Sequence, residues 1–253
     1  MSKLQALIFD VDGTMAETER DGHRVAFNRA FAEAGLDWNW SVSLYGELLK
    51  VSGGKERIRF YVQKYHPDFQ PTEDLNSFIA NLHATKTKYY QKIIAEGSLP
   101  LRLGVKRLIE EAHNQGVSLA ITTTTALPNV FALLKHHLGI DSPSWFEVIA
   151  AGDVVPLKKP APDIYQYALK ELALPAENCL AIEDSSNGLQ SALQAGIPTV
   201  ITVDEYTQNQ DFSGAKLVLN QLGEPEQPFR LLAGNAGEAS YLNIALAQYI
   251  LSN

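Results

Sequence analysis

"ALIFDVDGTMAETE", residues 6–19, joins a short apolar run to a pair of carboxylates near the start of the chain. Residues 6–9 are apolar throughout, which is typical of a strand that is buried on both faces of a parallel sheet. Asp10 and Asp12 follow at once, and two like charges beside a buried strand raise each other's pKa unless something compensates them. A divalent cation is the compensation that suits carboxylates. We therefore expect a metal site at the carboxyl end of the first strand.

Composition excludes several classes of function. The chain has 253 residues, a net charge of -8 and no basic run, so nucleic acid is not expected as a partner. Cys179 is the only cysteine, which excludes an intrachain disulfide and a zinc site built on cysteines. No run of about 18 apolar residues is present, so we expect no membrane span. The opening "MSKLQALIFD" enters the first strand without room for a leader, which predicts a cytoplasmic protein, or a plastid protein after processing in a eukaryotic phototroph.

Further apolar runs are separated by segments with helical spacing, and this alternation is typical of a doubly wound α/β domain with a parallel sheet. We expect a short sixth strand at the sheet edge, followed by an irregular surface segment over residues 220–241 and a last helix over residues 241–251. The expected strands after the first cover residues 117–122, 146–151, 179–184, 197–203 and 215–220.

The segment between the first and second strands is long and almost entirely helical in its spacing. Apolar residues recur at helical intervals from Val25 to Ala34, and Gly35 then provides a stop. We interpret residues 15–100 as a helical cap inserted into a core formed by residues 1–14 and 101–253. Gly13 and the segment 98–100 are the expected hinges.

Polar side chains follow several of the expected strands, where ligands bind in open α/β sheets. The second strand ends at Thr122, with Thr123 beside it, and the fourth ends at Glu183 and Asp184. A hydroxyl group and a lysine facing one point suit a phosphoryl group, whose charge must be neutralised before a carboxylate can attack it. Mg²⁺ is the cation that carboxylates and a substrate phosphate hold together, and we expect it as the cofactor.

Four stretches in order, "DVDGT", "AITT", "KKPAPD" and "AIEDSSNGLQSALQAG", resemble the four motifs of the haloacid dehalogenase superfamily of phosphotransferases. The resemblance implies a Rossmann-like core and a small helical cap. It implies Asp10 as the nucleophile that forms an aspartyl-phosphate and Asp12 as the general acid and base. Thr122 would bind the transferring phosphate, and Lys159, directly before Pro160, would neutralise the nucleophile and the phosphate.

The same resemblance implies which residues hold the metal. Mg²⁺ would be bound by the Asp10 carboxylate, the Asp12 backbone carbonyl and Asp184. Glu183 would lie close by or act through water.

Within the superfamily, the chain resembles the CbbY-type phosphatases, which remove the 1-phosphate from xylulose 1,5-bisphosphate, a misfire product that inhibits Rubisco of the Calvin cycle. The stretches "ETERDGHRVAFNRAFAEAGLDWNW", "SGGKERIRFY" and "VDEYTQNQDFSGAKLVLNQLG" support this subgroup. In the cap, Glu17 is expected to contact sugar hydroxyls and His23 to face the core. Lys55 and Arg57 are expected to bind a second phosphate, with Thr123 as a further substrate contact in the core.

Structural interpretations exist for the same residues. Thr122 could simply close its strand, Glu183 and Asp184 could cap the following helix, and Lys55 and Arg57 could solvate the start of another. Two other functions also remain open. One is a β-phosphoglucomutase, which passes the phosphoryl group to a sugar hydroxyl, and the other is a non-catalytic protein that binds a phosphate ester. We expect a monomer whose partner is a small sugar phosphate.

Overall fold

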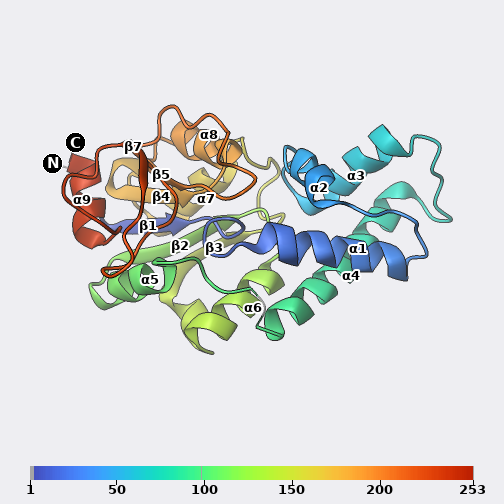
Figure 1. Cartoon of the computed structure of the whole chain (residues 1–253), viewed down its shortest axis with the longest axis horizontal. Helices are drawn as coiled ribbons and strands as arrows, with labels where there is room; N and C mark the ends of the chain where they lie inside the picture. Colours follow the sequence, from blue (N-terminus) through green and yellow to red (C-terminus); the bar gives the residue numbers. More distant parts are fainter. Residues whose placement is uncertain (1–2, 98, 253) are drawn as a thin grey trace.

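The computed structural model describes residues 3–97 and 99–252, which form a seven-stranded sheet with helices on both faces and a helical cap to one side (Figure 1). The strand order is β3-β2-β1-β4-β5-β6-β7, and neighbouring strands are parallel except for β6 and β7. The predicted doubly wound fold with its insertion after the first strand is confirmed. The strands are β1 (Ala6–Phe9), β2 (Ser118–Thr123), β3 (Phe146–Ala151), β4 (Cys179–Glu183), β5 (Thr199–Thr202), β6 (Leu217–Leu219) and β7 (Leu231–Gly234).

Both faces of the sheet are covered because its central strands are apolar on both sides. Leu7 and Phe9 of β1 belong to the apolar cluster that includes helices α5, α6 and α9. Ala6 and Ile8 point to the opposite face and belong to the cluster that includes α7 and α8, as the alternation of side chains along a strand requires. These helices are α5 (Val105–Asn114), α6 (Leu127–Leu138), α7 (Asp163–Leu172), α8 (Ser186–Gln194) and α9 (Ile244–Ser252), with short 3₁₀ turns at Ser142–Trp145 and Ala176–Asn178.

The C-terminal part of the sheet differs from the prediction. The expected edge strand is β6, but β7 lies outside it, within the segment predicted to be irregular. All four residues of β7 are exposed, so the sequence has no buried face whose alternation would mark a strand. Backbone pairing with β6 forms the strand instead. The strand β2 also ends at Thr123, one residue later than predicted, which matters for the site.

The cap contains a π-helix, η1 (Glu19–His23), that runs directly into the first of four α-helices. Trp38 and Trp40 are buried in an aromatic cluster of the cap that is separate from the two clusters on the sheet. The boundaries at residues 14/15 and 100/101 stay a prediction, and Ser98 of the expected second hinge lies outside the described residues. The cap helices are α1 (Arg24–Glu33), α2 (Val42–Leu48), α3 (Gly54–Tyr65) and α4 (Leu75–Ala95).

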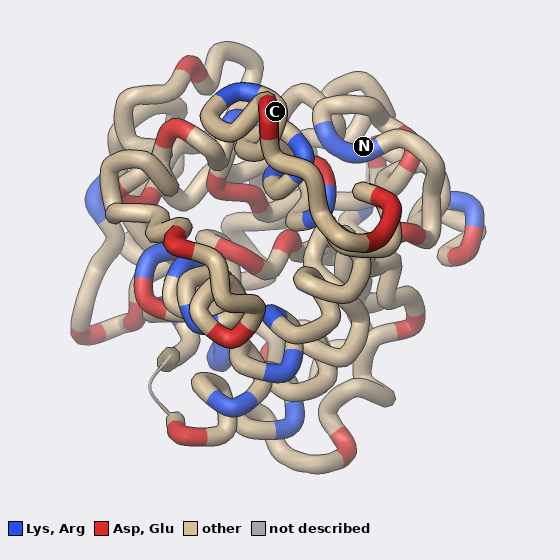
Figure 2. The backbone as a smooth tube through the Cα atoms, turned by 90° about the vertical axis from the view of Figure 1, so that its right-hand side faces the viewer, with Lys and Arg blue, Asp and Glu red and all other residues tan. Residues whose placement is uncertain are grey.

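Figure 2 shows positions of both charge signs, Lys and Arg as well as Asp and Glu, scattered over the backbone. Among the described residues, no helix has both the length and the apolar character needed to cross a bilayer.

Candidate active site

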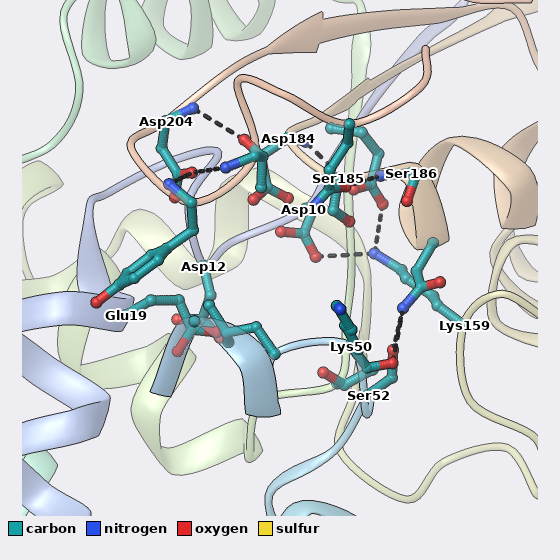
Figure 3. Close-up of a pocket in the computed structure, with 18 of the residues that line it drawn as sticks. Asp10, Asp12, Glu19, Lys50, Ser52, Lys159, Asp184, Ser185, Ser186 and Asp204 are labelled. Carbon is teal, nitrogen blue, oxygen red and sulfur yellow. Dashed lines mark hydrogen bonds and ion pairs between the residues drawn. The ribbon is translucent and has the colours of Figure 1, made fainter. Parts of the chain in front are cut away.

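A cavity of about 350 Å³ lies between the carboxyl ends of the central strands and the cap (Figure 3). Asp10 follows β1, Thr123 ends β2, and Glu183 and Asp184 stand at the end of β4, so strand ends supply most of its floor. The parallel sheet brings these residues to one edge because the carboxyl ends of its strands meet there. On the cap side, the cavity is lined by residues between Glu19 and Arg57.

Lys159 is the centre of the hydrogen bonds on this floor. Its ammonium group donates to Asp10 Oδ1 at 2.8 Å, to Glu183 Oε1 at 2.5 Å and to the Thr122 carbonyl at 2.9 Å. The Tyr165 hydroxyl also donates to Glu183 Oε1, at 2.6 Å, and so fixes that carboxylate from below. Burial lowers the pKa of Lys159, but the charges of Asp10 and Glu183 outweigh it and raise that pKa well above its ordinary value. The arrangement therefore holds a permanent positive charge against the carboxylate of Asp10.

The carboxylates of Asp10, Glu183 and Asp184 form a group that suits a metal ion, because each offers an oxygen within 4.8 Å of the others. Burial raises the pKa of Asp184 well above its ordinary value, and the charges of Asp10, Asp204 and Glu183 add to the effect. The pKa of Asp10 is raised well above its ordinary value for the same reason, although Lys159 opposes the shift. Carboxylates that are crowded in this way fit a hard divalent cation, which would remove their repulsion.

The approach of Asp184 also explains why glycine follows Asp12. A Cβ atom at Gly13 would lie 2.3 Å from Asp184 Oδ2, and Gly13 has a φ of +84°, which disfavours any side chain. Glu183 and Asp184 do not cap α8, since Ser185 does so by accepting a hydrogen bond from the backbone N–H of Gly188 at 3.1 Å. The carboxylates of Glu183 and Asp184 are therefore available to bind ligands in the cavity.

The side chain of Asp12 is held by residues of the cap and not by residues of the core. Its Oδ1 atom accepts a hydrogen bond from the Thr18 hydroxyl at 2.5 Å and lies 2.7 Å from His23 Nε2. Because the Lys86 ammonium lies 2.7 Å from His23 Nδ1 and can only donate, we assign the ring proton to Nε2, which then donates to Asp12. Burial would raise the pKa of Asp12, but His23 and Thr18 outweigh it and lower the pKa to about 2. His23 therefore acts on Asp12 and does not line the cavity, as the substrate contact expected from the sequence would.

The threonine expected to bind phosphate is displaced by one position. Thr122 is fully buried and shares a face of β2 with Ala120, which belongs to the cluster of α7, so its side chain does not line the cavity. Thr123 and Thr124 line it instead. A shift of one residue along a strand moves a side chain to the opposite face, and the sequence had placed the strand end one residue too early. Thr122 keeps a part in the site through its carbonyl, which accepts from Lys159.

Glu17 is not near the cavity, and this corrects the expectation that it contacts the sugar. Its side chain is 70% exposed and lies 3.8 Å from the Arg102 guanidinium. Glu19 lines the cavity in its place. The Tyr45 hydroxyl donates to Glu19 Oε2, and Arg57 Nη1 lies 3.9 Å from the same oxygen, so a buried pair of cap residues orients this carboxylate. The sequence offered no signal to choose between the two glutamates.

The two cap cations expected to bind a second phosphate occupy different places. Arg57 is buried at the cavity wall, where it donates to the Tyr45 hydroxyl at 2.9 Å and to the Leu48 carbonyl at 3.3 Å. Lys55 lines an adjoining cavity of about 280 Å³ and pairs with Asp153, which also accepts from Lys158 at 2.6 Å. Thr124 lines both cavities, so they are neighbours.

Lys50 lines the cavity, although no pattern in the sequence indicates it. It lies two residues beyond α2, and Figure 3 shows its side chain pointing into the space between Asp12 and Lys159. Asn187 of the core donates to the Lys50 carbonyl at 3.5 Å and to the Ser52 hydroxyl at 3.3 Å, which holds this segment over the site. A lone lysine in a cap loop has no local pattern, so only the closed arrangement of cap and core identifies it.

Comparisons with known proteins agree with this geometry. A family model of haloacid dehalogenase-like hydrolases matches residues 4–196. The CbbY protein encoded on a plasmid of Cupriavidus necator is 50% identical over 225 residues, which cover 89% of this chain and 88% of that protein. The crystal structure of CbbY from Rhodobacter sphaeroides with phosphate has a TM-score of 0.79 at 45% identity, covering 86% of this chain and 94% of that one.

A mutant of the Rhodobacter sphaeroides CbbY in complex with xylulose-(1,5)bisphosphate is similar as well. Its TM-score is 0.81 at 44% identity, with 86% of this chain and 94% of that chain covered. The similarity extends over the core motifs and the cap alike, since most of both chains is aligned. The chain therefore belongs to the haloacid dehalogenase-like hydrolases and, within them, to the CbbY group.

Proposed function

We propose that the chain is a Mg²⁺-dependent phosphatase that hydrolyses a sugar phosphate through an aspartyl-phosphate on Asp10. The observation that carries the proposal is the position of Asp10, whose Oδ1 accepts from Lys159 at 2.8 Å while the oxygens of Asp184 and Glu183 lie within 4.8 Å. A carboxylate held between a fixed cation and a metal site is suited to attack phosphorus, because the charge of the incoming phosphate is neutralised.

The reaction follows from the residues that line the cavity. An oxygen of Asp10 bonds to phosphorus while the ester bond to the sugar breaks. Asp12, whose pKa of about 2 leaves it ionised in the free protein, first takes up a proton from the bound substrate or solvent and then passes that proton to the leaving alkoxide. Asp12 then takes a proton from water, and the hydroxide attacks phosphorus, which releases phosphate and restores Asp10. Lys159 and the Thr123 hydroxyl position the phosphoryl oxygens. Mg²⁺, held by Asp10, Asp184 and the Asp12 carbonyl, would supply charge neutralisation at the phosphoryl group.

We propose xylulose 1,5-bisphosphate as the substrate. The support is the related CbbY of Rhodobacter sphaeroides, whose crystal structure holds this sugar, and the cations that the cap brings to the site. Lys50 points into the main cavity and Lys55 lines the adjoining one, so a second phosphate can be met by positive charge on the cap side. Glu19 is placed to accept hydrogen bonds from sugar hydroxyls.

A panel of sugar monophosphates and bisphosphates, assayed with and without EDTA, tests the proposal. We expect phosphate and xylulose 5-phosphate from xylulose 1,5-bisphosphate, loss of turnover in EDTA and its return with Mg²⁺. Asp10→Asn should lower kcat by about 10³-fold or more while the protein stays folded, because the amide cannot act as the nucleophile.

Two results would contradict the proposal. Conversion of glucose 1-phosphate into glucose 6-phosphate without release of phosphate would indicate a mutase. An absence of hydrolysis across the whole panel with Mg²⁺ present would indicate a binding protein.

A further inference from the structure

The loop between β5 and β6, residues 204–210, is a part of the core that reaches the cap. Several of its residues line the active-site cavity, among them Asp204, Tyr206 and Gln210. Gly46 of α2 and Lys50, two residues beyond that helix, line the same cavity from the cap. No role in the chemistry proposed above requires this loop, so its contacts need another explanation.

Hydrogen bonds within the core fix the shape of the loop. Asp204 Oδ1 accepts from the backbone N–H groups of Tyr206 and Thr207, each at 2.8 Å, and the Asp204 N–H donates to Thr207 Oγ1 at 2.9 Å. At its base, the buried Arg102 guanidinium donates to the Val203 carbonyl at 2.7 Å. These bonds lie within the core and fix the backbone at Tyr206, from which the ring extends to pack against the aromatic cluster of the cap.

The Tyr206 ring meets α2 at the one residue of that helix without a side chain. A Cβ atom at Gly46 would lie 2.9 Å from Cδ1 and 3.1 Å from Cε1 of Tyr206, and the ring also packs edge-on against Tyr45 with centroids 6.3 Å apart. Glycine is unfavourable within a helix, and Gly46 has no positive φ that would require it. Its presence is explained by the close approach of Tyr206.

A second contact joins the same loop to the start of the cap. Glu205 Oε2 accepts a hydrogen bond from Arg20 Nη1 at 2.7 Å. Because both side chains are at least half exposed, this ion pair contributes little to the free energy of unfolding, and its main effect is to orient the start of the cap relative to the loop. Arg20 lies in η1, the element that also carries His23, the partner of Asp12. The loop thus contacts η1, which carries Glu19 and His23, and α2, which leads into Lys50.

We infer that Tyr206 is a positioning residue, which seats against Gly46 and sets where the cap closes over the site. Lys50 lies four residues after Gly46, so the position of α2 determines where this ammonium group enters the cavity. The inference rests on the proposed function, because closure matters for expelling water and completing the site around the substrate. Tyr206 itself has no chemical step to perform.

A double-mutant cycle between Gly46 and Tyr206 tests the inference. Gly46→Ala favours the helix but places a methyl group against the ring, so we expect kcat/KM for xylulose 1,5-bisphosphate to fall about tenfold or more, mainly through KM. In a Tyr206→Ala background, where the ring is gone, the same substitution should change kcat/KM by less than about twofold. Tyr65→Ala, at an exposed cap tyrosine that lines no part of the cavity, is the control.

The outcomes are distinct from those that test the phosphatase. Equal losses from Gly46→Ala in both backgrounds, or no loss in either, would overturn the positioning role. Hydrogen exchange gives a readout without turnover, since Tyr206→Ala should speed exchange in α2 and leave α9 unchanged. A wild-type protein that hydrolysed no sugar phosphate would refute the proposed function, while unchanged exchange in α2 would refute the docking of the cap on Tyr206.

Discussion

Glu19 lines the cavity above Asp10, whereas Glu17, two residues earlier, is exposed and lies 3.8 Å from the Arg102 guanidinium. The two carboxylates are a matched pair for testing which one contacts the sugar. Glu19→Gln keeps the shape and removes the charge, so we expect the KM for the sugar phosphate to rise about tenfold, the equivalent of one charged hydrogen bond. Glu17→Gln should leave KM within about twofold. Steady-state kinetics on both variants measures these KM values. A larger rise in KM for Glu17→Gln than for Glu19→Gln would show that Glu17 contacts the sugar.

Thr122 and Thr123 allow a similar comparison inside the core. Thr123→Val removes a hydroxyl from the cavity, and we expect kcat/KM to fall about 10²-fold if that hydroxyl binds the transferring phosphate. Thr122→Val changes a buried side chain whose site contact is its backbone carbonyl, so kcat/KM should fall by less than about threefold. Thermal unfolding of both variants separates loss of activity from loss of fold. A larger kinetic loss in Thr122→Val would show that the sequence had placed the phosphate contact correctly.

These two pairs show where sequence reasoning succeeded and where it could not. The apolar run before Asp10 has an unambiguous pattern, which predicted the strand and its buried position. The same pattern therefore placed the carboxylates of Asp10 and Asp12 at the end of that strand. The end of β2 was ambiguous by one residue, because Thr122 and Thr123 are both good strand formers, and that single step changes which hydroxyl faces the cavity.

Tertiary contacts explain the other differences. In an extended chain Glu17 and Glu19 would share a face, but the π-helix that begins at Glu19 turns that residue toward Tyr45 and Arg57. The strand β7 exists because β6 offers it a free edge, with no buried face of its own. Lys50 can be assigned to the cavity only from the position of the cap against the core. Each of these features depends on contacts between distant segments.

The crowded carboxylates predict that Mg²⁺ binding is linked to pH. In the metal-free protein the pKa values of Asp10 and Asp184 are raised by burial, and a metal requires both groups to be ionised. We therefore expect Mg²⁺ to release protons when it binds near pH 6 and to bind more tightly as pH rises. Calorimetry in two buffers of different ionisation enthalpy measures this release. Binding without any release of protons at pH 6 would show that the carboxylates were already ionised.

The same shifts determine how stability depends on pH. Between the unfolded pKa of about 3.8 and the raised folded values, Asp10 and Asp184 bind more protons in the native state than in the unfolded chain, so their contribution to the stability of the metal-free protein falls as pH rises. Mg²⁺ offsets this loss by compensating the ionised carboxylates. The increase in Tm on adding Mg²⁺ should accordingly be larger at pH 7.5 than at pH 5.5, and Asp184→Asn should reduce the difference.

The two cap lysines predict how a bisphosphate is distinguished from a monophosphate. Lys50 points into the main cavity and Lys55 lines the adjoining one, where Asp153 is its present partner. We expect Lys50→Gln and Lys55→Gln each to raise the KM for xylulose 1,5-bisphosphate about tenfold, because each removes one charged contact to the second phosphate. The KM for a sugar monophosphate should stay within about threefold, and Lys106→Gln, at the start of α5 and outside both cavities, serves as the control. If both variants raised KM equally for the two substrates, the lysines would contact the sugar or the first phosphate, and the preference for a bisphosphate would have to come from other residues.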